Sequence, residues 1–264
     1  MSTPLSRRQF LAAAALAPFA WPGGKKGSVS LTFDDARPSQ LDNGLPLLAE
    51  AKARATFYVS PQRVRERAAD WRAALKAGHE IGNHSLSHPC TGNYAFSRRN
   101  ALEDYDLPRM ARDLDQASAE IRELLGAAPR TFAYPCGQTY VGRGAAHASY
   151  VPLVAKRFLA GRGYLNESAN DPAICDLAYL MGTGFDQLPF EEVKRLMEAA
   201  AREGRWLILA GHDIGPRRFQ SVESEVLLAV CRYANDPANG LWLAPVAEVA
   251  EHIRLARGGP APQA

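Results

Sequence analysis

Two short runs of polar residues have the types and the spacing that a hydrolytic metal site needs. The first is the pair Asp34-Asp35, and the second places His84 and His88 four positions apart. Two imidazoles and one carboxylate form a three-ligand set that leaves coordination positions open, which is typical of a catalytic rather than a structural metal site. We therefore predict that one aspartate binds a divalent ion together with both histidines, while its neighbour accepts protons.

The surrounding segments predict elements that would position these residues. Each run follows a short apolar segment, 29–33 or 79–83, that is typical of a strand entering a loop. A lone Asp-Asp pair at a strand end is more often a turn or a helix cap, so the prediction depends on both runs together. Further elements are expected as helices over 41–53, 61–77, 107–125 and 191–202, a helix capped by Ser221 and running through Tyr233, a helix begun at Pro245, and strands over 55–59, 130–134, 206–210 and 241–243. This alternation predicts an α/β fold with a largely parallel sheet.

At four segments the chain resembles the NodB-type polysaccharide deacetylases, the carbohydrate esterases of family 4. The segments are Thr32-Phe33-Asp34-Asp35, Glu80 to His88, Phe132-Ala133-Tyr134-Pro135-Cys136-Gly137, and Leu207 to Asp213. These segments occur in the order and at the spacing typical of the family, and together they span almost all of residues 27–258. We therefore predict that residues 27–258 form one deacetylase domain. The resemblance implies a distorted (β/α) barrel with fewer than eight full units.

The resemblance also implies a role for each matching residue. It implies that Asp34 is the general base, that His212 is the general acid, and that the metal ligands are Asp35, His84 and His88. A backbone N–H at Cys136 would contact the oxyanion, and the substrate would lie against Tyr134, Pro135 and Ala210. The divalent metal would be zinc by default, with cobalt, nickel or manganese as alternatives.

The chain departs from the family pattern at three places. Ala133 stands where many members carry an arginine that pairs with the base, so the base would lack its expected cationic partner. Cys136 replaces an aromatic residue, and the small Ala210 replaces a larger apolar one. No segment matches the motif whose aspartate orients the acid histidine; its substitute could be Asp171, Asp176 or Asp186, each of which could equally be a turn residue or a helix cap.

The implied activity is metal-dependent removal of acetyl groups from an N-acetylated polysaccharide or glycan. Two alternatives stay open: an O-acetyl sugar esterase of the acetylxylan type, and a catalytically silent relative that binds glycans. The presence of both Asp34 and His212 favours an enzyme, because a silent relative would need neither an acid nor a base.

The first residues of the chain predict its location, and its charge excludes one class of partner. Residues 1–22 contain Arg7-Arg8 followed by an apolar stretch too short to span a membrane, which predicts a twin-arginine export signal and a periplasmic or extracellular location. Residues 259–264 are expected to be a disordered tail. The formal charge is +3 and the chain has no basic run, so we expect no nucleic-acid partner. The resemblance implies a carbohydrate substrate, and we also expect no transmembrane segment in the mature chain and a monomer.

Four cysteines and two loops leave alternatives open. There is no Cys-x-x-Cys pair, and a bridge between Cys90 and Cys136 competes with free buried thiols. The segment 91–105, with Tyr94 and Phe96, could contact substrate or be a solvated connector. The segment 138–149, with Tyr140, Arg143 and His147, could form a sugar-binding rim, although His147 is better explained as a surface residue.

Overall fold

The computed structural model describes residues 19–259. The arginine pair of the predicted export signal therefore lies outside the described residues, as does all but Gly259 of the predicted tail. The described end of the 1–22 segment packs against the domain, because Trp21 is 4% exposed and its indole N–H donates to the carbonyl of Gly204.

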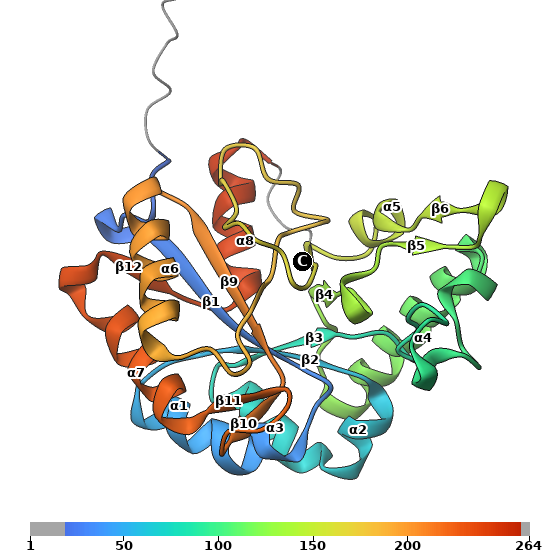
Figure 1. The fold of residues 1–264 in the computed structure, drawn as a ribbon, viewed down its shortest axis with the longest axis horizontal. Helices are drawn as coiled ribbons and strands as arrows, with labels where there is room; N and C mark the ends of the chain where they lie inside the picture. Colours follow the sequence, from blue (N-terminus) through green and yellow to red (C-terminus); the bar gives the residue numbers. More distant parts are fainter. Residues whose placement is uncertain (1–18, 260–264) are drawn as a thin grey trace, which may run out of the picture.

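One parallel sheet organises the molecule, and Figure 1 shows its strands with the helices around them. The strand order is β7-β4-β3-β2-β1-β9-β8, and β12 pairs with the beginning of β1. The strands of this sheet are β1 (Gly27–Asp34), β2 (Thr56–Val59), β3 (Glu80–Asn83), β4 (Thr131–Ala133), β7 (Ala160–Arg162), β8 (Thr183–Gly184), β9 (Trp206–Gly211) and β12 (Leu241–Leu243). The sheet curls into the distorted (β/α) barrel with fewer than eight full units that the sequence predicted.

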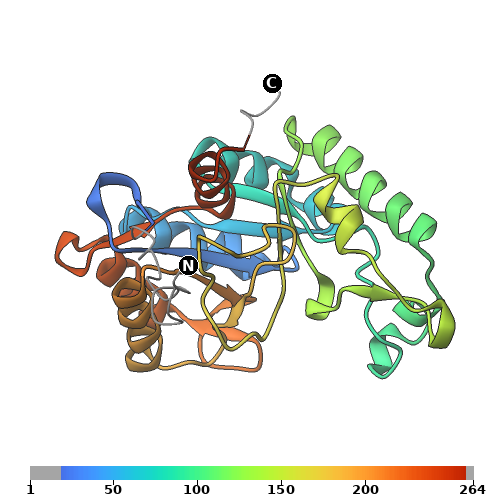
Figure 2. The ribbon, with the colours of Figure 1, turned by 90° about the horizontal axis from the view of Figure 1, so that it is seen from above.

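The helices cover the sheet. They are α1 (Leu45–Glu50), α2 (Pro61–Glu66), α3 (Ala68–Lys76), α4 (Leu107–Leu125), α5 (Val151–Ala155), α6 (Phe190–Glu203), α7 (Ser224–Asn235) and α8 (Val246–Ala256). Two small sheets complete the described strands: β5 (Tyr140–Val141) with β6 (Ala148–Ser149), and β10 (Asp213–Gly215) with β11 (Ser221–Glu223). Seen from above in Figure 2, α4 and the segment carrying β5 and β6 lie on the opposite side of the molecule from α6 and α7.

The central strand β1 is buried along its whole length, and its sequence alternates in a way that explains both of its faces. Val29, Leu31 and Phe33 belong to the apolar core beneath the outer helices. The residues between them are small and polar, and their hydroxyls donate to carbonyls of neighbouring segments, as Ser30 does to Ala244 and Thr32 to Leu209. Side chains alternate between faces along a strand, so Asp34 points to the same interior face as Thr32.

Several predicted element boundaries were wrong. The helix expected over 41–53 begins with a π-helical turn, Gln40–Gly44, and ends at Glu50. The helix expected over 61–77 is two helices, because Arg67 leaves the helical region with φ −139° and ψ 43°. Ser221 caps no helix: it lies in β11, and α7 begins at Ser224.

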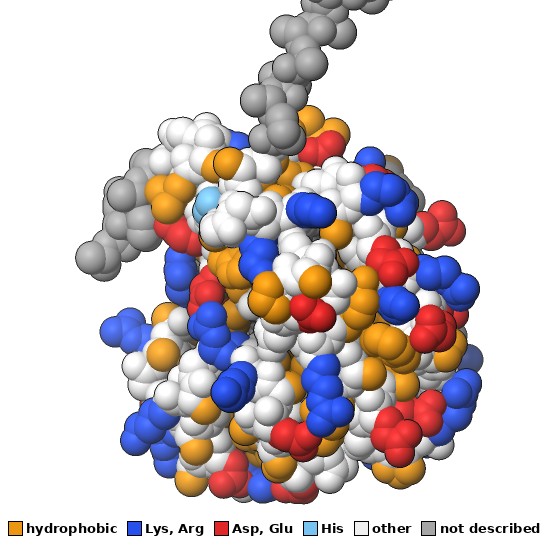
Figure 3. Space-filling model, turned by 90° about the vertical axis from the view of Figure 1, so that its left-hand side faces the viewer, with side chains coloured by type: hydrophobic (Ala, Val, Ile, Leu, Met, Phe, Trp, Pro, Cys, Tyr) orange, Lys and Arg blue, Asp and Glu red, His pale blue; other side chains and the backbone are white. Residues whose placement is uncertain are grey.

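Charged side chains of both signs are interspersed on the face that Figure 3 shows. Among the described residues, no helix combines the length and the apolar character needed to cross a membrane.

Candidate active site and metal centre

Asp35, His84 and His88 converge on one point at the carboxyl ends of β1 and β3. The Oδ1 atom of Asp35 lies 3.6 Å from Nε2 of His84 and 3.5 Å from Nε2 of His88. Ligands held at 2.0–2.2 Å around a tetrahedral zinc would be about 3.4 Å apart, so these separations fit a shared divalent ion. The structure thus brings together the three residues that the sequence predicted as ligands.

Hydrogen bonds hold the His84 imidazole and the turn that carries His88, and Nε2 of each histidine lies near Oδ1 of Asp35. Nδ1 of His84 donates to the carbonyl of Ala133 at 2.9 Å, which leaves its Nε2 free as a ligand atom. The turn that carries His88 is held by side chains: the Asn83 amide oxygen accepts from the Ser85 N–H at 2.6 Å, and the Ser85 hydroxyl accepts from the His88 N–H at 2.9 Å. Asn83 and Ser85, which belong to the second motif, therefore hold the turn that carries His88.

Several site residues adopt backbone angles that non-glycine residues rarely use. Asp35 has φ 75°, His88 has φ 48° and Cys136 has φ 54°. Left-handed angles at such residues cost about 1–3 kcal/mol each and persist only where the surroundings hold them. At Asp35 this angle turns the chain immediately after β1, which explains how two adjacent carboxylates can face different groups.

Asp34 has a cationic partner, contrary to the expectation from Ala133. The guanidinium of Arg162, which is fully buried on β7, forms an ion pair with Oδ1 of Asp34. Arg162 is the register partner of Ala133 across the β4–β7 pair, so the arginine comes from the neighbouring strand. In the strand order β7 and β1 are separated by three strands, and the two side chains meet because the sheet curls around its interior.

The interior of the barrel is shaped around the Arg162 side chain. Its Nη1 donates to the carbonyl of Gly163 at 2.9 Å, and its guanidinium carbon lies 5.0 Å from the centre of the Tyr58 ring. A Cβ atom at Gly182 would lie 2.5 Å from Cδ of Arg162, so this position requires glycine. Burial alone would raise the pKa of Asp34, but Arg162, His84 and His212 together hold the pKa below its ordinary value.

Asp186 is the carboxylate that contacts His212. Its Oδ2 lies 2.6 Å from Nδ1 of His212, and its Oδ1 accepts from the His212 backbone N–H at 2.9 Å. The other two candidates are turn residues: Asp171 accepts from the N–H of Ala173, and Asp176 from that of Ala178. Burial would lower the pKa of His212, but the hydrogen bond to Asp186 and the charge of Asp34 raise it above its ordinary value.

Two residues that sequence reasoning missed organise the end of β1. Arg37 holds Oδ2 of Asp35 at 2.9 Å and also pairs with Asp213, so the remaining oxygen of Asp35 faces the histidines. The buried amide of Gln40 donates to the carbonyls of Asp34 and His212, which ties the end of β1 to the end of β9. Both follow the first motif within six positions, and that proximity is the signal in the sequence that could have identified them.

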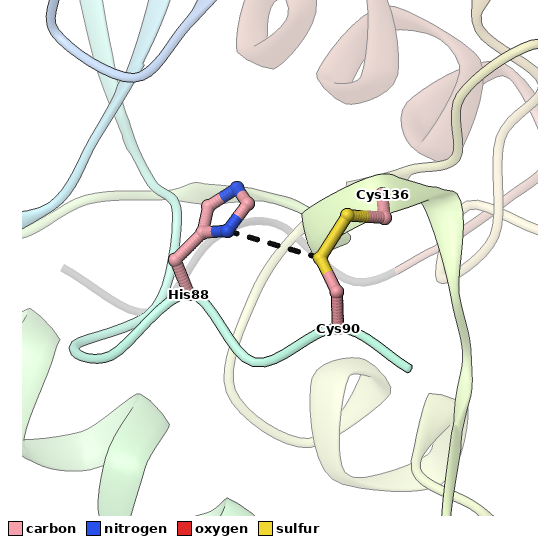
Figure 4. A group of neighbouring side chains, drawn as sticks. All are labelled: His88, Cys90 and Cys136. Carbon is pink, nitrogen blue, oxygen red and sulfur yellow. Dashed lines mark hydrogen bonds between the residues drawn. A yellow bond between two sulfur atoms is a disulfide. The ribbon is translucent and has the colours of Figure 1, made fainter. Parts of the chain in front are cut away.

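Cys90 and Cys136 form a disulfide beside His88 (Figure 4). Sγ of Cys90 lies 3.8 Å from Nδ1 of His88. His88, Cys90 and Cys136 lie close together, but they do not form a second metal site, because two sulfurs joined to each other are not thiolate ligands. The bridge closes a loop across 46 positions and joins the loop of the second motif to that of the third.

The pKa values of Asp35 and His88 favour the forms of these side chains that bind metal. Burial raises the pKa of Asp35, but the charges of His84 and His88 outweigh it and lower the pKa to about 2. Burial and the charge of His84 lower the pKa of His88 to about 4. Near neutral pH Asp35 is therefore ionised and His88 is neutral, as metal ligation requires.

The three predicted substrate contacts lie away from the cavity surface. A cavity of about 780 Å³ adjoins the ligand set and is lined by Asp34, His212 and Cys136 among others. Tyr134, Pro135 and Ala210 are buried, and the hydroxyl of Tyr134 donates to the carbonyl of Ala178 at 2.6 Å. Their position argues against direct side-chain contact with a substrate. The possible rim residues Tyr140, Arg143 and His147 do not line this cavity either.

Sequence comparison shows which known proteins this chain resembles. The family model described as polysaccharide deacetylase matches residues 22–149, which carry both runs of ligands and the third motif. A peptidoglycan-N-acetylglucosamine deacetylase from Bacillus cereus is 39% identical over 66 residues, 25% of this chain and 31% of that protein. A chitooligosaccharide deacetylase from Sinorhizobium fredii is 40% identical over 63 residues, 24% of this chain and 29% of that protein. The matched segments span less than a third of these curated relatives.

Solved structures share the fold over almost the whole chain. A protein from Mycobacterium smegmatis, named as a candidate polysaccharide deacetylase, superposes with a TM-score of 0.65 at 19% identity, covering 94% of this chain and 97% of that one. The peptidoglycan deacetylase PdaC from Bacillus subtilis superposes with a TM-score of 0.53 at 20% identity, covering 88% and 93%. A carbohydrate esterase family 4 pseudoenzyme from Bacillus anthracis has the same fold, with a TM-score of 0.51 at 16% identity over 86% and 66%. Residues 22–149 therefore match the polysaccharide deacetylase family model, and the described chain has the fold of solved polysaccharide deacetylases.

Proposed function

We propose that the protein is a metal-dependent hydrolase that removes acetyl groups from an N-acetylated glycan. The proposal rests on one observation: three candidate metal ligands lie beside a candidate base and a candidate acid, each of which is held by a buried partner. Asp34 and His212 line the same cavity as Asp35, His84 and His88, and each of the two has its own buried partner. A glycan-binding protein without activity would need neither partner.

Each residue can be given one step of the hydrolysis. Asp34, kept ionised by Arg162, accepts a proton from the attacking water as the water oxygen bonds to the acetyl carbon. The backbone N–H at Cys136 donates to the carbonyl oxygen as negative charge develops on it. His212, kept protonated by Asp186, donates a proton to the nitrogen as the carbon–nitrogen bond breaks, so acetate and a free amine result.

A divalent ion held by Asp35, His84 and His88 would polarise the carbonyl and lower the pKa of water. Two imidazoles and one carboxylate suit zinc, which we propose as the resident metal, and they also accept cobalt, nickel or manganese. Arg37 holds the second oxygen of Asp35, so that carboxylate would bind through one oxygen.

Acetate release tests the activity and separates the alternatives. Purified protein should contain about one divalent ion per chain and release acetate from at least one N-acetylated glycan in a panel that also contains acetylated xylan. Chelation should abolish the release, and zinc should restore it. Release from acetylated xylan alone would identify an O-acetyl esterase. Binding of glycans without any release would identify a silent relative of the kind that the Bacillus anthracis pseudoenzyme represents.

The Asp186→Asn variant should shift the pH dependence of the reaction. His212 acts as an acid only when protonated, so its contribution is lost as the pH rises through its pKa. Because the hydrogen bond to Asp186 raises that pKa, the substitution lowers it and moves the alkaline limb of kcat to lower pH. Measuring kcat across pH 5–10 (a range set by the ~6.5 reference pKa of histidine) checks this. An unmoved alkaline limb would assign that limb to another group.

We also propose that the chain is exported by the twin-arginine route to the periplasm or beyond and acts there as a monomer on a carbohydrate. Arg7-Arg8 and the short apolar stretch after them support the route. Replacing both arginines with lysine should leave the protein in the cytoplasmic fraction. Sizing of the exported protein by light scattering would test the monomer.

A further inference from the structure

Exposed apolar side chains concentrate around the metal site. In the described part of the chain, seven large hydrophobic side chains are exposed: Tyr94, Phe96, Leu165, Ile174, Met181, Phe219 and Leu255. Four of the seven, including both phenylalanines, line the cavity that holds the ligand set. Phe96 is 70% exposed and Phe219 is 81% exposed. An exposed cluster of this kind at a cavity is typical of a ligand-binding surface.

The aromatic rings approach the metal site from two sides. Tyr94 and Phe96 belong to the loop after β3, whereas Phe219 belongs to the loop between β10 and β11, which follows β9. In the sheet, β3 and β9 lie on either side of β2 and β1, the strand that ends in the carboxylate pair. The ring of Phe96 lies 6.4 Å from that of the metal-ligand candidate His88. A molecule placed with its reacting group at the ligand set can therefore extend over aromatic surface in two directions.

The surface on the β3 side is rigidly held. The rings of Tyr94 and Phe96 are stacked, with centroids 5.5 Å apart and planes 6° from parallel. The hydroxyl of Ser97 accepts from the N–H of Cys90 at 2.9 Å and donates to its carbonyl at 2.8 Å. The disulfide in turn fixes Cys90 to Cys136. The rings are thus presented before any ligand binds, which reduces the entropy lost on binding.

The loop that carries Phe219 is anchored as well. The neighbouring Gln220 accepts from Arg37 at 2.7 Å through its side chain, and its carbonyl accepts from the N–H of Asp213 at 3.0 Å. Arg218 pairs with the same Asp213 at 3.0 Å. Phe219 itself makes none of these contacts, so its ring is free to contact a ligand.

A second cavity provides a polar complement. It measures about 560 Å³ and shares Asp35, Arg37 and His88 with the first. Its other lining residues include Ser60, Gln62, Arg63 and Ser87, which carry hydrogen-bonding side chains. A sugar ring has an apolar C–H face and a rim of hydroxyls. The first cavity offers aromatic side chains to the C–H face, and the second cavity, which continues from it, offers polar side chains to the hydroxyls. The polar side chains of the second cavity would not suit a lipid chain, which has no hydroxyls to pair with them.

We propose that Phe96, supported by Tyr94, and Phe219 are stacking sites for the sugar rings that neighbour the acetylated sugar, so that the protein acts within glycan chains rather than on single sugars. The inference rests on the proposed function and extends it to the length of the substrate. Flat aromatic faces cover the C–H face of a sugar ring with little loss of side-chain entropy. The affinity should therefore rise with the number of linked sugars.

Oligosaccharide binding tests the proposal separately from catalysis. The probes are N-acetylglucosamine and its β-1,4-linked oligomers of up to six units, titrated calorimetrically into the zinc-loaded Asp34→Asn variant. The affinity should rise about tenfold or more from the monomer to the longer oligomers. Phe96→Ala and Phe219→Ala should each weaken binding of the hexamer by about five- to tenfold and leave binding of the monomer unchanged, on the scale of aromatic contacts.

Matched variants separate ring stacking from general effects. Phe96→Trp should keep the affinity for the hexamer, whereas Phe96→Leu, which is apolar but not flat, should lose it. Ile174→Ala removes a side chain that is 81% exposed and does not line the cavity, so it should change nothing. All these positions are exposed, so folding should be unaffected, which thermal melting checks.

The possible outcomes distinguish this inference from the proposed function. If acetate is released but the affinity does not depend on length, or does not respond to Phe96→Ala and Phe219→Ala, the stacking sites are refuted and the deacetylase activity stands. If no glycan in the panel releases acetate but binding is length-dependent and sensitive to both substitutions, the activity is refuted and the stacking sites stand. Absence of both results refutes both.

Discussion

Replacing Asp34 with Asn lowers the rate of acetate release by about 10²-fold or more and leaves the metal content of the protein unchanged. Asparagine keeps the shape of the side chain and an acceptor oxygen for Arg162, but it cannot take a proton from water. The metal should stay because the proposed ligands are Asp35, His84 and His88, whereas Asp34 pairs with Arg162. Metal analysis and kcat measured on the same preparation check the two halves of this prediction.

The matched control is Asp35→Asn, which should lose most of the bound metal. The two aspartates are adjacent and chemically identical, so only their directions distinguish them: Asp34 lies on the inner face of β1, and Asp35 turns away at φ 75°. If Asp34→Asn lost the metal and Asp35→Asn kept it, the two roles would be reversed. A thermal melt must accompany both variants, because Asp34→Asn also removes the counter-charge of a buried guanidinium.

The sequence predicted the parts of the site that lie within single motifs. The sequence could predict the candidate ligands and the candidate acid because each belongs to a short run at the end of a strand, and a strand end is a local feature. The helix α4 was predicted with its observed bounds because it is long, has a regular apolar stripe and ends at Gly126. Long periodic segments of this kind depend little on the rest of the fold.

The parts that the sequence could not predict depend on closure of the sheet. Arg162 lies on a three-residue strand, too short to show a period, and 128 positions separate it from Asp34. Nothing in its local sequence distinguishes it from a surface arginine except the glycines on both sides of it. Asp186 was one of three equivalent candidates until His212 was placed beside it. The disulfide was likewise one of several alternatives, because cysteine spacing alone does not specify pairing.

The second large effect is expected at Arg162. Arg162→Met should reduce the free energy of unfolding by about 3–5 kcal/mol, because it leaves a carboxylate that is 3% exposed without its buried partner. Asp34 can avoid this by taking up a proton, but a protonated Asp34 is not a base, so acetate release should fall with stability. Urea unfolding and kcat at a temperature where the variant remains folded measure the two effects independently.

Moving the arginine back across the sheet tests whether its position or its mere presence matters. Ala133 and Arg162 are register partners on adjacent parallel strands, so their side chains point to the same face of the sheet. The double variant Ala133→Arg with Arg162→Ala should therefore recover at least about tenfold in kcat relative to Arg162→Ala alone, since one recovered pairing of about 1.4 kcal/mol in the transition state corresponds to that factor. Ala133→Arg alone should be less stable than the parent, because two guanidinium groups would then compete for one carboxylate. If the double variant were as inactive as Arg162→Ala while its melting temperature recovered, Arg162 would act on the reaction through something other than the charge that it places beside Asp34.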